Sequence, residues 1–85
     1  SYKISLGDNV MITMNEIRNN LCEAIKLGGL SQTELAKKLN IKQPTISKYL
    51  AGKAMPSLDT FANLCVILDL DPSDILNVDN EKKKQ

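Results

Sequence analysis

Apolar residues recur at spacings of three and four along most of the chain, which is the period of a helix with one buried face. The first such stripe consists of Met14, Ile17, Leu21, Ala24 and Ile25. Thr13 precedes it and Glu16 lies three positions later, as in a capping box. Gly28-Gly29 then supplies a left-handed stop. The pattern predicts a first helix over residues 14–27.

A second capping box lies at Ser31 and Glu34, directly before a short apolar pattern. That pattern consists of Leu35, Ala36 and Leu39. Asn40 tolerates the left-handed conformation of a tight turn, which places Ile41 to fold back onto the core. We therefore expect a second helix over residues 32–39.

A third helix is predicted over residues 44–51, only a few residues after the second. Pro44 fixes φ and has no amide proton to lose, so it suits the first helical position with Gln43 as the cap. Ile46 and Leu50 then form the inward stripe.

Two further helices follow. Ser57 is placed to cap a fourth helix. The apolar face of this helix consists of Leu58, Phe61, Leu64, Cys65 and Leu68. Asp71 and Pro72 begin a short last helix in the same way, with Ile75 and Leu76 turned inward. The expected fold is all-α, a compact five-helix domain over residues 13–77.

The two ends of the chain look different from this domain. Residues 1–12 alternate apolar and polar positions at first and predict a short extended arm. The arm is either a leader or strap over the core, or an apolar patch that pairs two subunits. Residues 78–85 form a polar, lysine-ended tail that we interpret as a solubilising segment.

Composition narrows the functional classes. With 85 residues the chain accommodates one small domain, and its 42% hydrophobic residues suffice for a core. Histidine is absent, which removes the commonest general base and metal ligand, so we expect no enzyme, no metal and no cofactor. Cys22 and Cys65 lie in apolar helical patterns and read as reduced core thiols. No apolar run approaches the ~20 residues needed to cross a bilayer, so we expect a cytoplasmic protein.

The 11 basic residues nearly balance the 10 acidic residues in number, but the two kinds are unevenly distributed along the chain. Residues 31–58 contain a single acid, Glu34, and five lysines: Lys37, Lys38, Lys42, Lys48 and Lys53. Residues 59–81 contain no base and six acids: Asp59, Asp69, Asp71, Asp74, Asp79 and Glu81. One side of the domain should therefore be electropositive.

The second and third helices, joined by a tight turn, match a helix-turn-helix unit. Such a unit sets one helix on the phosphate backbone and the next in the major groove. Ser31 and Gln32 begin the second helix, where side chains and amides can hold a phosphate. The outward side of the third helix carries Gln43, Thr45, Ser47 and Lys48.

Four segments of the chain resemble, in order and spacing, the Cro/CI-type (XRE) helix-turn-helix family over about residues 14–77. They are LSQTELA at 30–36, IKQPTI at 41–46, YLAGK at 49–53 and PSLDTF at 56–61. With the outward placement above, the resemblance implies base reading by Gln43, Pro44, Ser47 and Lys48. It implies phosphate contacts from Ser31, Gln32, Thr45, Lys53 and Ser57.

Three positions complicate the resemblance. Pro44 offers only ring contacts where many relatives carry a polar reader. Leu50 stands where some relatives place an acid, which suggests apolar packing instead. Tyr49 is open to two interpretations, as a packing residue or as a phosphate donor.

The sequence thus predicts a sequence-specific regulator of transcription, a repressor whose homodimer binds double-stranded operator DNA. The arm and the junction of the last two helices, including Leu70, are the candidate dimer surfaces. The alternative is a protein-interaction module, such as the antitoxin of a toxin-antitoxin pair, in which the apolar arm binds a protein partner.

Overall fold

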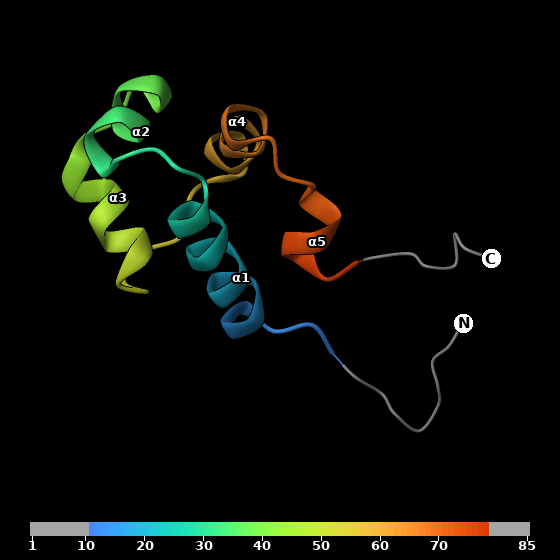
Figure 1. The fold of residues 1–85 in the computed structure, drawn as a ribbon. Helices are drawn as coiled ribbons and strands as arrows, with labels where there is room; N and C mark the ends of the chain where they lie inside the picture. The colour runs from blue at the N-terminus through green and yellow to red at the C-terminus, as the bar shows by residue number, and fades with distance from the viewer. Residues whose placement is uncertain (1–10, 79–85) are drawn as a thin grey trace.

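The computed structural model describes residues 11–78 of the chain, which form five helices (Figure 1). They are α1 (Met14–Leu27), α2 (Gln32–Leu39), α3 (Gln43–Leu50), α4 (Leu58–Leu68) and α5 (Pro72–Leu76). The predicted all-α, five-helix fold is confirmed. Most of the predicted arm and tail falls on residues 1–10 and 79–85, outside the described residues.

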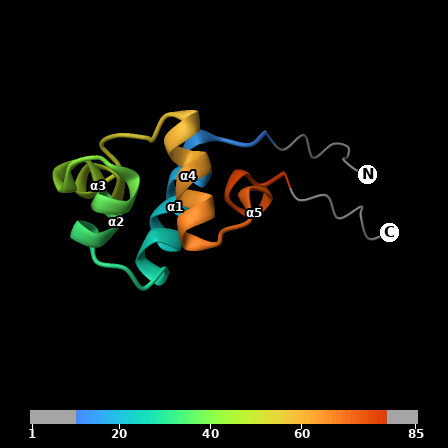
Figure 2. The same cartoon turned by 90° about the horizontal axis from the view of Figure 1, so that it is seen from above.

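The helices are arranged along the molecule with α1 between its two ends. The helix pair α2 and α3 packs together, while α1 packs against α3 and also against α5. Figures 1 and 2 show the α2–α3 pair at one end and α5 at the other. The helix-turn-helix unit therefore projects from a scaffold made by the remaining helices.

The core lies where α1 to α4 meet. Each of these helices contributes one fully buried side chain, and these are Leu21, Leu35, Ile46 and Leu64. Burial of one such side chain stabilises the fold by about 1.5–3 kcal/mol. Because α3 is anchored by Ile46 at the centre of this cluster, its opposite face is fixed toward solvent.

The two predicted capping boxes form to different extents. At α2 both halves are present, since the Glu34 amide donates to Ser31 Oγ at 3.0 Å and the Ser31 amide donates to Glu34 Oε1 at 3.1 Å. At α1 the Glu16 amide donates to Thr13 Oγ1 at 3.2 Å. The Glu16 carboxylate instead accepts from Asn77 Nδ2 at 3.2 Å, which ties the start of α1 to the end of α5.

Three helices end on a left-handed residue that is not glycine. Asn40, Asp69 and Asn77 have φ of 60°, 57° and 61°, a region that Asn and Asp enter at low cost. In each case the next amide donates back to a carbonyl five residues earlier, as from Ile41 to Ala36 at 3.0 Å. Asn40 confirms its predicted role, whereas the sequence reading did not single out Asp69 and Asn77.

Some sequence-based assignments are wrong. Met14 and Leu58 are 54% and 86% exposed, because each lies in the first turn of its helix, short of the residues that reach the core. The third helix begins at Gln43 rather than Pro44 and ends at Leu50 rather than Ala51. Its cap is Lys42, whose side chain has no acceptor and makes no capping bond.

The two cysteines agree with expectation. Cys65 is buried, Cys22 is half-buried, and both are free thiols. Burial, followed by the Asp71 charge, raises the pKa of the Cys65 thiol. Within the part of the chain that the structure describes, no helix is long and apolar enough to cross a membrane.

Candidate nucleic-acid interface

The exposed face of α3 forms one wall of a shallow hollow of about 360 Å³. The hollow is lined by Gln43, Pro44, Ser47, Lys48, Ala51 and Lys53. The four predicted base-reading residues are therefore together on one surface, and all four are exposed. Ile46, on the same helix, is fully buried.

Lys53 reaches this hollow because of the way α3 ends. Gly52 takes the left-handed conformation at φ 76°, and its amide donates to the Tyr49 carbonyl at 3.1 Å. The next amide, of Lys53, donates to the Lys48 carbonyl at 2.9 Å, which completes a Schellman motif. The positive φ favours glycine at this position. A Cβ at Gly52 would also lie only 3.2 Å from Arg18 Cδ, so a larger residue would crowd the Arg18 side chain. The motif thus brings Lys53 to the hollow that Lys48 also lines.

A hydrogen bond joins the starts of the two helices. Gln43 Nε2 donates to Gln32 Oε1. The first residue of α3 is therefore held by the first residue of α2. Gln32 is half-buried and Gln43 is exposed. Each side chain keeps further polar capacity, because an amide has two donor hydrogens and an acceptor oxygen. The sequence placed both residues outward but did not indicate that they contact each other.

The start of α2 carries hydrogen-bond donors beside a carboxylate, since Glu34 Oε1 accepts from the Ser31 amide. Ser31 Oγ accepts from the Glu34 amide, which leaves the hydroxyl proton as a donor. The first amides of a helix also carry the positive end of its dipole. Thr45 is half-buried and is not among the residues that line the hollow.

Ser57 has a different environment from the other predicted phosphate contacts. Its hydroxyl donates to the Asp59 carboxylate. This bond and the Thr60 amide, which donates to Asp59 Oδ1 at 2.9 Å, lower the pKa of the Asp59 carboxyl. A carboxylate thus lies beside the Ser57 hydroxyl at the start of α4.

Burial indicates the roles of Tyr49 and Leu50 in the structure. Tyr49 is only 6% exposed, and burial, followed by the Asp59 charge, raises the pKa of its hydroxyl. Its side chain belongs to the buried core cluster, so Tyr49 is a packing residue. Its carbonyl accepts from Cys22 Sγ at 3.2 Å, which links α3 to α1. Leu50 is half-buried and packs against the core, as predicted.

Comparison with known proteins gives one match. A family model described as helix-turn-helix matches residues 23–75, which span α2 to α4, the end of α1 and most of α5. Neither the curated proteins nor the solved structures contain a match to the chain.

Proposed function

The chain belongs to the Cro/CI-type (XRE) helix-turn-helix family and is a DNA-binding regulator of transcription, and from this premise we propose that it recognises one operator sequence with α3. The observation that carries the proposal is the hollow that holds Gln43, Lys48 and Lys53 on one exposed surface. In the proposed complex, the start of α3 enters the major groove, which at ~12 Å is wide enough for a helix.

We assign base reading chiefly to Gln43 and Lys48. A glutamine amide can pair with adenine through two hydrogen bonds, and a lysine can donate to guanine O6 and N7. The bond from Gln43 to Gln32 supports this assignment, because it restricts the rotamers of Gln43 before DNA is bound. Ser47 and the ring of Pro44 line the same hollow and contact neighbouring base edges.

Phosphate contacts would set the register of the protein on the duplex. We assign them to Ser31 and Gln32 at the start of α2, to Thr45, and to Lys53 at the end of the hollow. Ser57 is left out, since its hydroxyl donates to Asp59 and that carboxylate repels a phosphate.

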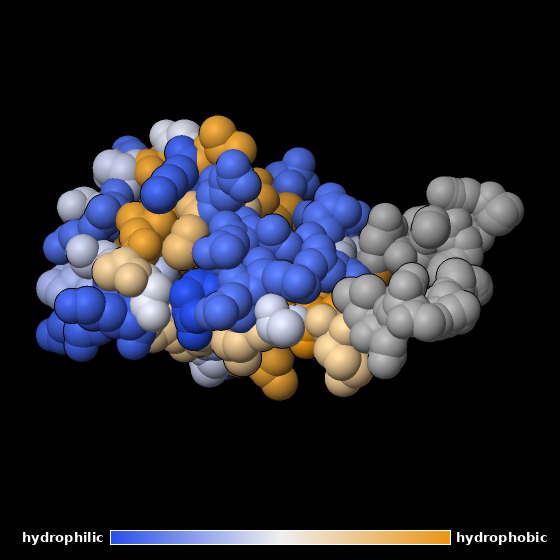
Figure 3. All heavy atoms as spheres, turned by 90° about the horizontal axis from the view of Figure 1, so that it is seen from below, coloured by the Kyte–Doolittle hydropathy of each residue, from blue (hydrophilic) through white to orange (hydrophobic). Residues whose placement is uncertain are grey.

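The active form is proposed to be a homodimer that represses by occupying its operator. One copy presents few base-reading side chains, and two copies on half-sites about one helical turn apart double them. The exposed apolar residues where α1 begins and α5 ends support such pairing, and we call them the terminal apolar patch: Met11, Ile12, Met14 and Val78. Figure 3, which views the molecule from below, shows apolar side chains along the lower edge of the face that it draws. The earlier candidate Leu70 fits less well, because carboxylates surround it.

The two classes of contact predict different effects of substitution. Gln43→Ala should relax the base preference at one position by about 1–3 kcal/mol and barely change non-specific affinity. Lys53→Ala should weaken binding to all sequences alike and reduce the salt slope by about one. Selection from randomised duplexes, followed by titration at several salt concentrations, measures both.

Lys53→Arg is the matched control, because it keeps the positive charge and should keep the salt slope. The assignment is wrong if Gln43→Ala selects the same sequence as the unmodified protein. A role as a protein-interaction module is compatible with this proposal, since a second surface lies apart from α3.

A further inference from the structure

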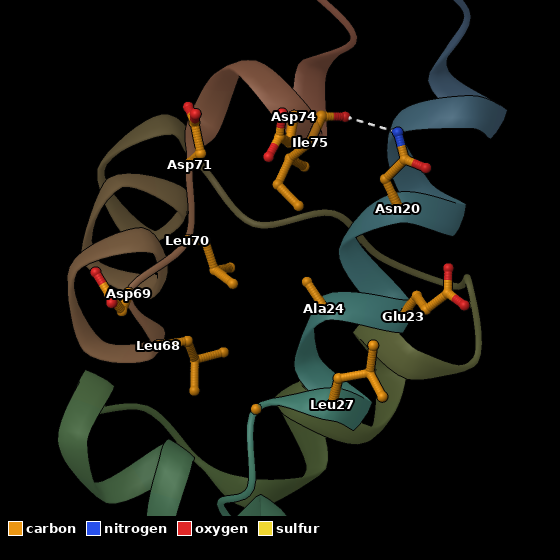
Figure 4. Close-up of a pocket in the computed structure, with 11 residues that line it drawn as sticks. Asn20, Glu23, Ala24, Leu27, Leu68, Asp69, Leu70, Asp71, Asp74 and Ile75 are labelled. Atoms are coloured by element: carbon orange, nitrogen blue, oxygen red, sulfur yellow. Dashed lines mark hydrogen bonds between the residues drawn. The ribbon is translucent and has the colours of Figure 1, made fainter.

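A second hollow lies at the end of the molecule opposite α3, between the end of α1, the end of α4 and α5 (Figure 4). Its volume of about 510 Å³ can accommodate several side chains. Figure 4 shows Ala24, Leu68 and Leu70 pointing into it, with Ile75 above and Leu27 at the lower edge. We call this surface the α1–α5 groove. Leu27 is 80% exposed, so the apolar surface continues to the rim.

The rim of the α1–α5 groove is acidic. Four of the described residues that line it are acids and none is a base, the acids being Glu23, Asp69, Asp71 and Asp74. One carboxylate is engaged in the fold, since Asp71 Oδ1 accepts from the Ser73 amide at 2.9 Å and caps α5. Apolar side chains surrounded by carboxylates form a surface complementary to an apolar residue flanked by positive charges.

Two other occupants fit the groove poorly. A small polar ligand needs converging donors, but the only side-chain amide among its lining residues, Asn20, already donates to the Ile75 carbonyl and to Asn77 Oδ1 at 3.1 and 3.2 Å. A second copy of this groove, packed face to face, would bring like charges together.

We propose that the α1–α5 groove binds a basic amphipathic helix of a partner protein, with its leucine-type side chains on the apolar floor and its lysines or arginines against the rim. Figures 1 and 2 place α5 and α3 at opposite ends of the molecule. The partner can therefore bind while α3 occupies DNA. The proposal rests on the groove alone and stands independently of the DNA contacts.

The test is a titration without DNA of the full chain with a synthetic helical peptide. The peptide carries leucines at i, i+3, i+4 and i+7 and lysines at the remaining positions. Backbone amide NMR shifts should map to the groove, around Ala24 and Leu68 to Leu70. Peptides with serine in place of leucine, or glutamate in place of lysine, should bind at least about tenfold more weakly.

Matched variants distinguish binding at the groove from general attraction of the basic peptide to acidic residues elsewhere on the protein. Asp74→Asn and Asp59→Asn each neutralise an exposed acid in the first turn of a helix, but only Asp74 lines the groove. Asp74→Asn should weaken the peptide about threefold and Glu23→Gln/Asp74→Asn about tenfold, while Asp59→Asn leaves affinity unchanged. Far-UV circular dichroism checks that each variant is folded.

Several outcomes would overturn the proposal. Equal loss in Asp59→Asn, shifts spread over the whole surface, or unchanged binding of the serine peptide would each do so. Groove shifts that depend on protein concentration alone would assign the surface to a second copy. Groove shifts produced by replacing Lys82, Lys83 and Lys84 with serine, without peptide, would assign it to the chain's own tail.

Discussion

At the residue scale, the α3 surface depends on which side chains the core leaves outside. Ile46 fixes the phase of α3, so the outward positions of Ser47 and Lys48 follow from the 3.6-residue period. Gln43 lies three residues before Ile46, and it is exposed because it is the first residue of the helix. The contact between Gln43 and Gln32 does not follow from any period, because it depends on the path of the turn between two helices. Likewise the pattern does not specify the Asp59 carboxylate beside Ser57, because the Ser57 side chain bonds to Asp59 and makes no capping bond.

The Gln32–Gln43 hydrogen bond gives a prediction at this scale. Gln32→Ala should lower both affinity and base selectivity, because it removes the proposed phosphate contact and frees the rotamers of Gln43. In a double-mutant cycle with Gln43→Ala, the two effects on specific DNA binding should be coupled by about 0.5–1.5 kcal/mol. Additive effects would show that the two side chains act independently on DNA.

At the element scale, helix boundaries were well predicted where capping residues mark them. The bounds of α1 and α2 agree with the sequence-based ranges, since Thr13, Ser31 and Asn40 act as expected. Periodicity failed at Met14 and Leu58, because it identifies the side of a helix that is apolar but not where the neighbouring helix ends. The start of α3 was displaced because proline is tolerated throughout the first turn of a helix, so it does not mark one position.

The capping boxes give a prediction for stability. Ser31→Ala should destabilise the protein by about 1–2 kcal/mol, since it removes an oxygen that accepts from the Glu34 amide in a box with both halves formed. Thr13→Ala should cost less, about 0.5–1 kcal/mol, because Glu16 does not complete the box there. Urea unfolding monitored by circular dichroism measures both. A larger effect at Thr13 would contradict this reading of the two helix starts.

At the scale of the whole molecule, the unequal distribution of charge seen in the sequence becomes two ends with different chemistry. Lys48 and Lys53 share the hollow at the α3 end, whereas the α1–α5 groove is ringed by acids. Sequence could predict this polarity because lysines and acids fall in separate stretches. It could not predict the groove, which forms only when segments from three helices meet.

The proposed homodimer is tested at the terminal apolar patch. Met14→Asp should raise the dimer dissociation constant about tenfold or more, since it removes a methionine from the proposed contact. The substitution should not destabilise α1, because an acid in the first turn is favourable. Sedimentation equilibrium measures the effect. The control is Val66→Asp, which alters an exposed apolar residue on α4, outside the terminal apolar patch. If only Val66→Asp dissociates the dimer, the interface lies on α4 instead.

Recognition of DNA by α3 should be specific for one sequence. Its most direct test is titration of the full chain against its best selected duplex and a scrambled duplex of equal length, at about 50 and 200 mM salt. We expect a preference of about 1,000-fold or more for the selected duplex. Equal affinity for the two duplexes with a steep salt dependence, or no binding to either, would contradict it.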